Sequence, residues 1–415
     1  MAVRLILLDN GGVQDPWNLR AYLKNGGFTA FVKARDTMQP KAIIDEIKRS
    51  GLTGRGGAGF PCGIKWELAR KARSKKKYLI CNADEGEVGT FKDRYLLTHS
   101  PFRLIEGMCI AGLAIGARQG YIYLRAEYHN LFEKLYRAID QVKEEGFLDH
   151  LDIKVYEGAG AYICGEESAL MNSIEGERGE SRYKPPYPPT QGLWNRPTVI
   201  NNVETLMNIP YIIANGATWF SETGTSRSKG TKVFCVSGDV KKPGIYELVM
   251  GSSLKELVID LAGAENIKAV QVGGSAGAII PGHLIDTPLS HESVLGSGAI
   301  TVFNSSRDII NIIYNNMRFL NEESCGKCTP CREGTKVMLE ILARLIHGEG
   351  IEGDMDALED IANTMALASM CGLGQAAAVP VQDSLKYFRD EYSKRIDQSM
   401  FMRSYLSGSL AGQRR

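Results

Sequence analysis

Four cysteines near the C-terminal end constrain this chain more than any other feature of its sequence. Cys325, Cys328 and Cys331 follow one another at C-x2-C-x2-C spacing, and Cys371 stands alone forty residues later. A [4Fe-4S] cluster takes four cysteine thiolates, and a tight run of this kind lets one loop bind three irons while a distant cysteine binds the fourth. The spacing therefore predicts an iron–sulfur cluster and a protein that transfers electrons.

Zinc is the alternative metal for four thiolates. Structural zinc sites usually consist of two separated C-x2-C pairs, whereas here three cysteines crowd together and one is isolated. The pattern favours the cluster, with zinc or unliganded thiols as the alternatives. The remaining cysteines show no ligand spacing and are predicted to be free and buried: Cys62, Cys81, Cys109, Cys164 and Cys235.

Length and composition predict an ordinary globular protein of two or three domains, because 44% of the 415 residues are hydrophobic and 23% are charged. The formal charge of +1 provides no general attraction to nucleic acid or to anionic lipid, so neither is an expected partner. We interpret the basic run at residues 71–77 as a solvated helix end rather than a phosphate site.

No segment of the sequence is predicted to insert into a membrane. The longest strongly apolar stretch, residues 107–117, is far shorter than the roughly twenty residues that span a bilayer. Residues 1–10 lack the charged, apolar and cleavage regions of a signal peptide. We therefore expect a cytoplasmic protein whose cysteines are thiols or metal ligands.

Up to about residue 220, short apolar runs alternate with helical patterns, which predicts a layered α/β domain. Strands are predicted at residues 78–81, 121–124 and 153–156, and helices at residues 41–49, 102–115 and 131–142. A loop rich in proline and tyrosine follows at residues 183–189. Long irregular loops in compact domains are usually functional or disordered.

The composition changes near Lys229. Short strands at residues 233–236, 245–249 and 269–272, with a helix at 254–261, predict a small β-rich domain. From residue 306 onward the pattern is helical, which predicts a bundle with helices at residues 317–320, 337–346, 357–366 and 381–392. The four clustered cysteines fall at the ends of these helices, where backbone N–H groups stabilise thiolates.

A glycine-rich segment, Gly54 to Gly59, satisfies the pattern G-x-G-x-x-G. It follows a helical segment rather than a strand, so it is not a regular Rossmann fingerprint, and no Gly-Lys-Ser/Thr completes a Walker A motif. Glycines nevertheless let the backbone approach a phosphate or a flat ring closely, and Arg55, Lys65 and the following helix N-terminus add positive charge. The alternative is a purely structural turn.

A second glycine-rich turn, residues 158–167, lies between a predicted strand and a predicted helix and ends in Glu166 and Glu167. Acids at a helix start are often only partners of the helix dipole. Three more acids follow an earlier strand: Asp84, Glu85 and Glu87. Because strand ends of an α/β sheet meet in one crevice, these carboxylates could bind ribose hydroxyls and repel a 2′-phosphate.

Together these segments resemble the NADH-binding flavoprotein subunit of respiratory complex I and its relatives, the diaphorase subunits of NAD-linked hydrogenases and formate dehydrogenases. The resemblance covers nearly the whole chain. It rests on six motifs, at residues 54–61, 81–85, 91–94, 160–167, 200–205 and 323–331. It implies hydride transfer between NAD(H) and FMN, then one-electron transfer to a [4Fe-4S] cluster, without a catalytic acid or base.

The resemblance also implies ligand residues. FMN would be held by Gly54, Arg55, Gly56, Gly57, Lys65, Asn82, Asp84, Glu85, Tyr162, Gly165, Glu166, Asn201 and Asn202. NADH would be contacted by Phe60, Glu87, Glu167 and Tyr187, with Glu87 and Glu166 as positioning residues, and the cluster by Cys325, Cys328, Cys331 and Cys371. Two positions depart from the family pattern, since Leu68 replaces an aromatic residue and Tyr187 replaces a phenylalanine.

At the level of domains, the resemblance implies a Rossmann-like FMN- and NADH-binding domain at residues 1–225, a ubiquitin-like β-grasp domain at 226–305 and a helical bundle with the cluster at 306–415. A thioredoxin-like [2Fe-2S] subunit and a further iron–sulfur or catalytic subunit are the implied partners.

The sequences at residues 9–16 and 371–375 favour the hydrogenase and formate dehydrogenase branch, of which some complexes bifurcate electrons, over the complex I arm. A zinc-stabilised scaffold protein and a membrane-associated electron relay are the alternatives from other classes.

Overall fold

The computed structural model describes residues 5–9 and 14–396. Part of the N-terminal segment that favours one branch of relatives, residues 10–13, lies outside the described residues. The chain divides into two compact units. The first comprises Met1–Glu265, Val272–Gly274 and His283–Val302, and the second comprises Asn266–Gln271, Ser275–Gly282 and Phe303–Arg415.

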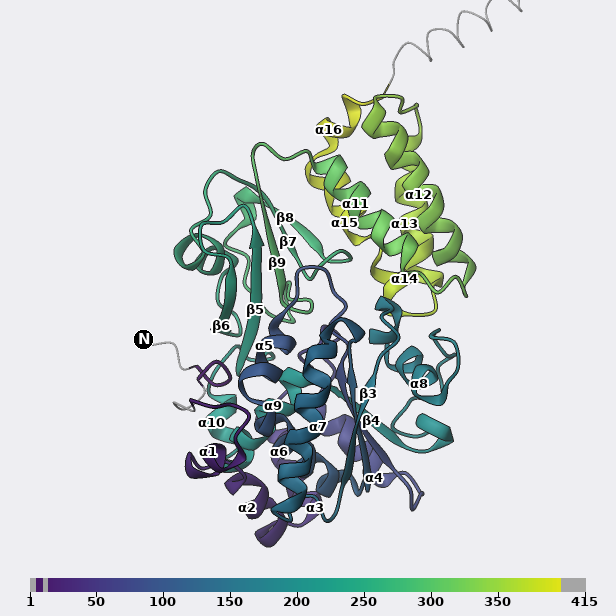
Figure 1. The fold of residues 1–415 in the computed structure, drawn as a ribbon. Coiled ribbons are helices and arrows are strands. Elements are labelled where there is room, and N and C mark those ends of the chain that lie inside the picture. The colour runs from purple at the N-terminus through teal and green to yellow at the C-terminus, as the bar shows by residue number, and fades with distance from the viewer. Residues whose placement is uncertain (1–4, 10–13, 397–415) are drawn as a thin grey trace, which may run out of the picture. The chain divides into compact units, whose positions relative to one another are not determined.

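A four-stranded parallel sheet forms the centre of the first unit (Figure 1). Its strands are β1 (Tyr78–Ala83), β2 (Gln119–Leu124), β3 (Asp152–Glu157) and β4 (Thr198–Asn202). They lie in the order β3-β2-β1-β4, so the chain order is not the spatial order and crossover connections join the strands. The predicted α/β fold with a parallel sheet is confirmed. Because all strands run the same way, their carboxyl ends lie at one edge.

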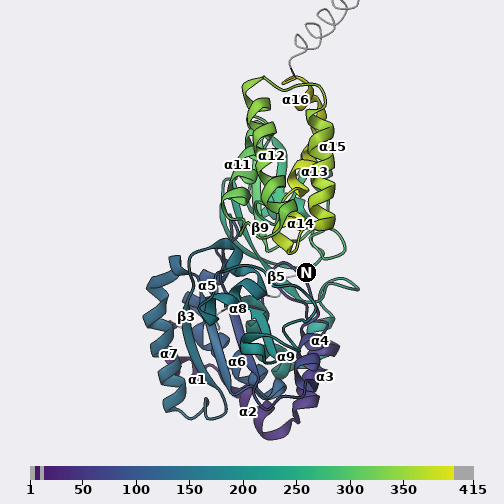
Figure 2. The same cartoon turned by 90° about the vertical axis from the view of Figure 1, so that its right-hand side faces the viewer.

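The two faces of this sheet differ because alternate side chains point to opposite sides. One face packs against α6 (Pro101–Ile115), α7 (Phe132–Glu144) and α9 (Val203–Asn215), and α8 (Glu167–Glu175) lies on the other side (Figure 1). Figure 2 views this unit from the side of α8. The helix-covered face is apolar, whereas the α8 side carries a row of tyrosines: Tyr78, Tyr121, Tyr123 and Tyr156.

The remaining helices of the first unit surround this sheet. They are α1 (Leu19–Lys24), α2 (Thr29–Thr37), α3 (Pro40–Ser50), α4 (Cys62–Lys71), α5 (Lys92–His99) and α10 (Ala217–Ser221), with short turns η1 (Ala126–Leu131), η2 (Tyr162–Gly165) and η3 (Leu193–Asn195). The predicted helices at residues 41–49, 102–115 and 131–142 are confirmed as α3, α6 and α7. No helix in the described part of the chain is both long and apolar enough to cross a bilayer.

A second sheet begins after the α/β part. In the first unit, β5 (Thr231–Gly238) pairs antiparallel with β6 (Gly244–Val249) and parallel with β9 (Ala299–Asn304). The predicted strands at 233–236 and 245–249 are confirmed, and the helix predicted at 254–261 is present as the shorter η4 (Glu256–Leu261). The assignment of this region to a β-grasp fold stays a prediction.

The second unit is mostly helical. Its elements are β7 (Ile267–Val272) up to Gln271, β8 (Ala278–Pro281), α11 (Ile309–Glu322), α12 (Thr329–His347), α13 (Asp354–Ala368), α14 (Gly372–Ala376), α15 (Val379–Tyr387) and α16 (Arg389–Ser393), whereas η5 (Gly282–Leu284) belongs mostly to the first unit. The predicted helical bundle is therefore present. The single helix predicted at 381–392 is wrong, because the chain leaves helical geometry at Phe388, where φ is −130°, and divides into α15 and α16.

Candidate functional site

Three asparagines gather at the carboxyl edge of the parallel sheet. Asn82 lies near the end of β1, and Asn201 and Asn202 end β4. The strand register pairs Asn82 with Asn202 and Cys81 with Asn201. The crevice at the carboxyl ends of parallel strands is the usual ligand site of α/β sheets. The structure therefore brings these predicted FMN residues together.

Each asparagine is held by a hydrogen bond to a different part of the site. Asn82 Nδ2 donates to the carbonyl of Gly165 at 2.9 Å, which joins β1 to the second glycine-rich turn. Asn201 Oδ1 accepts from the indole Nε1 of Trp66 at 2.9 Å. Asn202 Oδ1 accepts from the backbone N–H of Glu204 at 3.0 Å and so caps α9. Trp66 was not predicted as a site residue. The available signal was its position in the helix that follows the glycine-rich segment.

The glycine-rich segment forms a closed loop between α3 and α4. The backbone N–H of Gly54 donates to the carbonyl of Phe60 at 2.9 Å and closes this loop. A Cβ atom on Gly56 would lie 3.1 Å from the Cβ of Asn202, and Gly57 has a φ of +122°. Glycine therefore permits the close approach and the backbone conformation that this loop requires. The result is a backbone cradle beside the asparagines, which fits a phosphate or flavin ring.

The two cations expected near this cradle behave differently. The Arg55 side chain is fully buried and donates to Thr53 and to the carbonyl of Lys229, so its charge points into the protein. Only its backbone remains at the loop. Lys65 Nζ lies 3.1 Å from the carbonyl oxygen of Ile200 and 3.5 Å from Glu167 Oε2, which keeps it at the edge of β4.

Glu166 and Glu167 share one lysine. Glu166 caps α8 by accepting hydrogen bonds from the backbone N–H groups of Ser168 and Ala169, at 2.9 and 3.0 Å. Lys184 Nζ lies 2.7 Å from Glu166 Oε1 and 3.1 Å from Glu167 Oε1. Burial alone would raise the pKa of Glu166, but Lys184 and the helix N–H groups bring that pKa below its ordinary value. Glu166 is therefore charged, and Lys184 is a site residue that was not predicted.

Glu87 and Tyr162 join the first acidic loop to the second glycine-rich turn. The Tyr162 hydroxyl donates to Glu87 Oε2 at 2.7 Å. A Cβ atom on Gly274, where φ is +81°, would lie 2.1 Å from Glu87 Oε1. The absence of a side chain at Gly274 therefore leaves the space that the Glu87 carboxylate occupies.

Glu85 has a different role from its neighbours. Its carboxylate is buried and accepts from the backbone N–H groups of Asp93 and Arg94, at 2.9 and 3.1 Å, and from the Tyr128 hydroxyl at 2.9 Å. Burial, with the nearby charge of Asp93, raises the pKa of Glu85 to about 7. The side chain thus serves the start of α5, although it was predicted to contact FMN.

Large apolar side chains are exposed on the segments that flank this edge. Phe60, Leu68 and Tyr187 are 46%, 43% and 57% exposed. Lys65 Nζ lies 5.9 Å from the centroid of the Phe60 ring. Exposed aromatic side chains of this size suit stacking against a flat ligand.

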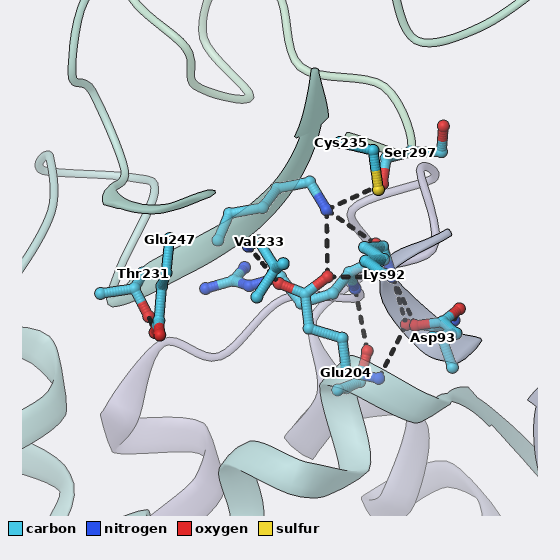
Figure 3. A network of polar contacts seen from close by, with 12 residues as sticks. Lys92, Asp93, Glu204, Thr231, Val233, Cys235, Glu247 and Ser297 are labelled. Carbon is cyan, nitrogen blue, oxygen red and sulfur yellow. Dashed lines mark hydrogen bonds and ion pairs between the residues drawn. The ribbon is translucent and has the colours of Figure 1, made fainter. Parts of the chain in front are cut away.

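A buried network of charges lies directly behind Asn202 (Figure 3). Asn202 Nδ2 donates to Asp93 Oδ2 at 2.6 Å, and Lys92 Nζ donates to Asn202 Oδ1 at 3.3 Å. Lys92 also lies 2.6 Å from Asp93 Oδ1 and 3.0 Å from Glu204 Oε2. The network continues to β5, where Lys232 Nζ lies 3.3 Å from Glu204 Oε2. The sequence motifs contain the residues of this network except Lys232, and the pairing was not predicted.

The pKa values of the two lysines in this network are shifted in opposite directions. Burial would lower the pKa of Lys92, but Asp93 and Glu204 raise it above its ordinary value. Burial lowers the pKa of Lys232 to about 8, and its attraction to Glu204 does not offset this. The difference arises because Lys92 has two carboxylate partners and Lys232 shares one. The two positive charges behind Asn202 are therefore matched by the two carboxylates Asp93 and Glu204.

In the second unit, three of the four clustered cysteines lie at helix starts, and Cys325 lies in the loop between α11 and α12. Cys328 immediately precedes α12, Cys331 lies in its first turn, and Cys371 precedes α14. Burial raises the pKa of the Cys331 thiol to about 11, and the thiols of Cys328, Cys371 and Cys325 add to this rise, so these three lie within electrostatic reach of Cys331. Helix N-termini stabilise thiolates at such positions.

The donor set fits a polynuclear cluster. No three histidine, cysteine or acidic side chains in the described ranges surround a single ion position. A [4Fe-4S] cluster binds each thiolate to a different iron, so its ligands need not converge on one point. A Cβ atom on Gly374 would lie 2.9 Å from the Cβ of Cys331. The absence of a side chain at Gly374 therefore lets α14 lie close to Cys331. The other five cysteines are free and buried, as predicted.

Two family models match the chain. The Nuo51 FMN-binding domain matches residues 47–211, which include the glycine-rich loop and the asparagines. The NADH-ubiquinone oxidoreductase-F iron–sulfur binding region matches residues 311–395, which include the clustered cysteines.

Curated relatives and solved structures agree with these models. The NADH-quinone oxidoreductase F 2 subunit of Rhizobium meliloti (strain 1021) is 43% identical over 411 residues, covering 95% of this chain and 98% of that protein. The HndC subunit of the NADP-reducing hydrogenase of Solidesulfovibrio fructosivorans is 42% identical over 406 residues, covering 94% and 82%. A crystal structure of NAD+-reducing [NiFe]-hydrogenase in the H2-reduced state matches with a TM-score of 0.88 and 38% identity, covering 100% of this chain and 72% of that one.

Proposed function

Because this chain belongs to the family of NADH-binding flavoproteins that includes the F subunits of NADH-quinone oxidoreductases, we propose that it connects NAD(H) to the electron-transfer subunits of an NAD-linked hydrogenase or formate dehydrogenase. The chain is an oxidoreductase subunit that binds NADH, FMN and a [4Fe-4S] cluster. These groups supply hydride transfer between NADH and FMN and one-electron transfer to the cluster.

The close packing of the glycine-rich loop on Asn202 is the observation that supports the proposed FMN site. The backbone N–H groups of this loop are proposed to bind the FMN phosphate, with Lys65 adding positive charge. Arg55 is proposed to fix the shape of the loop, because its guanidinium is buried and its backbone N–H donates to Thr205 Oγ1 at 2.9 Å. The amides of Asn82, Asn201 and Asn202 are proposed to orient the flavin.

NADH is proposed to lie against Phe60 and Tyr187, which expose aromatic rings. Glu87 and Glu167 are proposed to hold its polar groups, and Glu87 and Glu166 to position the reactants. Carboxylates at this place accept hydrogen bonds from a ribose 2′-hydroxyl and repel a 2′-phosphate, so NADH is the expected nucleotide.

The cluster is proposed to be bound by Cys325, Cys328, Cys331 and Cys371. The electrostatic effect of the other three thiols on the buried Cys331, and the positions of Cys328, Cys331 and Cys371 at helix starts, support this assignment. We also propose the three-part organisation given above, with domains at 1–225, 226–305 and 306–415. A cytoplasmic location is proposed from the five free, buried cysteines.

The parent complex is proposed from the kinds of relatives that match. HndC and the NAD+-reducing hydrogenase resemble this chain over nearly its whole length and support the hydrogenase branch. The relative from Rhizobium meliloti keeps the complex I arm as the second candidate. In either case a thioredoxin-like [2Fe-2S] subunit is the proposed neighbour, and affinity purification from the native cell would identify it.

The decisive experiment is an anaerobic visible spectrum of the purified chain, with flavin, iron and sulfide quantified before and after NADH. We expect one FMN, four irons and bleaching of the flavin absorbance. Gly56→Ala should lower the FMN content, because its Cβ would lie 3.1 Å from Asn202, whereas Gly244→Ala meets nothing within 4 Å and should not. Absence of flavin, or zinc in place of iron after anaerobic reconstitution, would contradict the proposal.

A further inference from the structure

A cavity of about 440 Å³ lies at the edge of the parallel sheet opposite the proposed FMN site. Its walls are formed by Lys76, Tyr78, Gln119, Tyr121, Trp194 and Arg196. Tyr78 begins β1 and Gln119 begins β2, so the cavity is at the amino ends of these strands. The six residues of β1 put its two ends roughly 17 Å apart at the usual rise per residue. A ligand here would not touch the flavin residues at the carboxyl ends.

Three aromatic rings form one wall of the cavity. Tyr78 and Tyr121 point to the same face of the sheet, with ring centroids 6.3 Å apart. The indole of Trp194 lies against both, with centroids 5.1 Å from Tyr78 and 6.1 Å from Tyr121, at interplanar angles of 61° and 63°. No described residue forms a hydrogen bond with the Tyr78 or Tyr121 side chain.

The backbone at Trp194 presents its ring in an unusual way. Its φ and ψ are 47° and 41°, a left-handed conformation that bulky residues rarely adopt. Its backbone N–H donates to Glu175 Oε1 at 2.6 Å, which holds this conformation, and its side chain is 42% exposed. A strained backbone that displays a large aromatic ring beside a cavity is typical of ligand contacts.

Two cations complete the cavity. Lys76 Nζ lies 5.1 Å from the centroid of the Tyr78 ring, and Arg196 contributes to the lining. Neither forms an ion pair with a described residue, and no acidic residue lines the cavity. The charge of Asp152 acts on Tyr121, and Asp152 lies 3.8 Å from Lys154.

We propose that this cavity binds a planar aromatic anion of mononucleotide size, with its ring against Trp194 and its anionic group between Lys76 and Arg196. Ligand cavities commonly measure about 300–1,000 Å³ and combine apolar walls with a few polar groups, as here. Aromatic rings and cations together select a flat, negatively charged molecule. The basic run at residues 71–77 thus has a role beyond solvation, and the proposal does not depend on the flavin site.

The test is equilibrium dialysis of AMP against the cofactor-loaded protein. Lys76→Ala/Arg196→Ala should weaken one class of binding sites by roughly tenfold or more. The matched control, Arg73→Ala/Lys75→Ala, also removes two positive charges. Both residues belong to the basic run but lie outside the cavity, so this variant should leave AMP binding unchanged. Equal losses in both pairs, or no saturable site, would overturn the proposal.

Three further arms identify the ligand chemistry. Adenosine, which lacks the anion, and inorganic phosphate, which lacks the ring, should each bind at least tenfold more weakly than AMP. Comparison with 4-hydroxybenzoate, an aromatic carboxylate, distinguishes two kinds of aromatic anion. If it binds more tightly than AMP, the ligand of this cavity is a carboxylate, and if it binds more weakly, the ligand is a nucleotide. Adenosine binding as strongly as AMP would contradict the recognition of an anion.

The place at which AMP binds must be identified by a measurement that does not depend on its affinity. Photolabelling with 8-azido-AMP should modify the peptides that contain Tyr78 or Trp194, and Trp194→Phe should retain labelling better than Trp194→Ala. NADH-dependent ferricyanide reduction by Lys76→Ala/Arg196→Ala should equal that of the unaltered protein. Labelling confined to the carboxyl edge of the sheet, or lost NADH oxidation in this variant, would overturn the assignment.

Discussion

Lys92 Nζ lies 3.0 Å from Glu204 Oε2, and the two side chains are only 2% and 0% exposed. Burying charges is costly unless each has a partner, and Glu204 is the shared partner of Lys92 and Lys232. The same network holds Asn202 at the proposed flavin site. Interactions that stabilise the fold and interactions that organise the site therefore coincide here.

Glu204→Ala should strongly destabilise the first unit, because it leaves two buried lysines with less compensation. Removing one partner of a buried ion pair typically costs about 3–5 kcal/mol of unfolding free energy. Urea unfolding followed by circular dichroism measures this. As a control, Glu265→Ala removes a partner of the exposed Lys241 and should change stability little. Equal effects of the two substitutions would contradict the role of the network.

His291 should make folding sensitive to mild acid. Burial, together with the charges of Arg55 and Lys232 and against the opposing effect of Glu292, lowers its pKa from 6.5 to about 4. Between these two pH values the unfolded chain binds a proton that the folded chain does not, so stability falls as the pH falls from 6.5 towards 4.

His291→Gln removes this titration and can still contact Thr53, which lies 3.0 Å from Nε2 of His291. As the pH is lowered through this range, the unfolding free energy should therefore fall more steeply for the unaltered protein than for the variant. Parallel curves would show that His291 titrates normally.

Tyr162→Phe should weaken NADH binding more than FMN binding, although the resemblance counts Tyr162 among the FMN residues. The substitution removes the 2.7 Å hydrogen bond to Glu87, and a lost hydrogen bond of this kind costs about 1–2 kcal/mol, or roughly 5- to 30-fold in KM for NADH. Steady-state ferricyanide reduction gives KM, and the visible spectrum gives the FMN content. Tyr246→Phe, which removes an exposed hydroxyl from β6, is the matched control. Lost FMN with unchanged KM would reverse the assignment.

Cys371→Ser should lower the iron content of the purified chain well below four per molecule, because the fourth iron loses its thiolate. Cys109→Ala removes a buried free thiol elsewhere and should keep full iron loading. Iron and sulfide analysis and the electron paramagnetic resonance spectrum after reduction distinguish the two. Full loading in Cys371→Ser would remove this residue from the ligand set.

The sequence predicted the sheet because buried parallel strands are short apolar runs that stand out between helices. This holds for β1, β2 and β3, each of which is two residues longer in the structure than its predicted core at 78–81, 121–124 or 153–156. The strand β4 was missed. Its sequence, Thr-Val-Ile-Asn-Asn, is brief and passes directly into α9, so no turn marks its end.

Within the site, sequence motifs indicated which residues gather but not how their side chains pair. Lys184 contacts Glu166 from 18 positions away, and Lys232 contacts Glu204 from 28 positions away. Such contacts depend on the tertiary fold and leave no periodic signal. Arg55 shows the same limit. Its position in the glycine-rich segment predicts a contact with a ligand, but its side chain is buried and its charge points into the protein.

Asn202 has two tasks at once, since the side chain proposed to contact FMN also caps the first turn of α9. Any change in the hydrogen bonding of this amide is therefore transmitted to the start of a helix that packs against β1 and β4. Amide hydrogen exchange at Glu204 and Thr205 should slow when the flavin is bound. Cofactor release would then expose α9 to local opening, and apoprotein would be degraded faster than holoprotein at the same temperature.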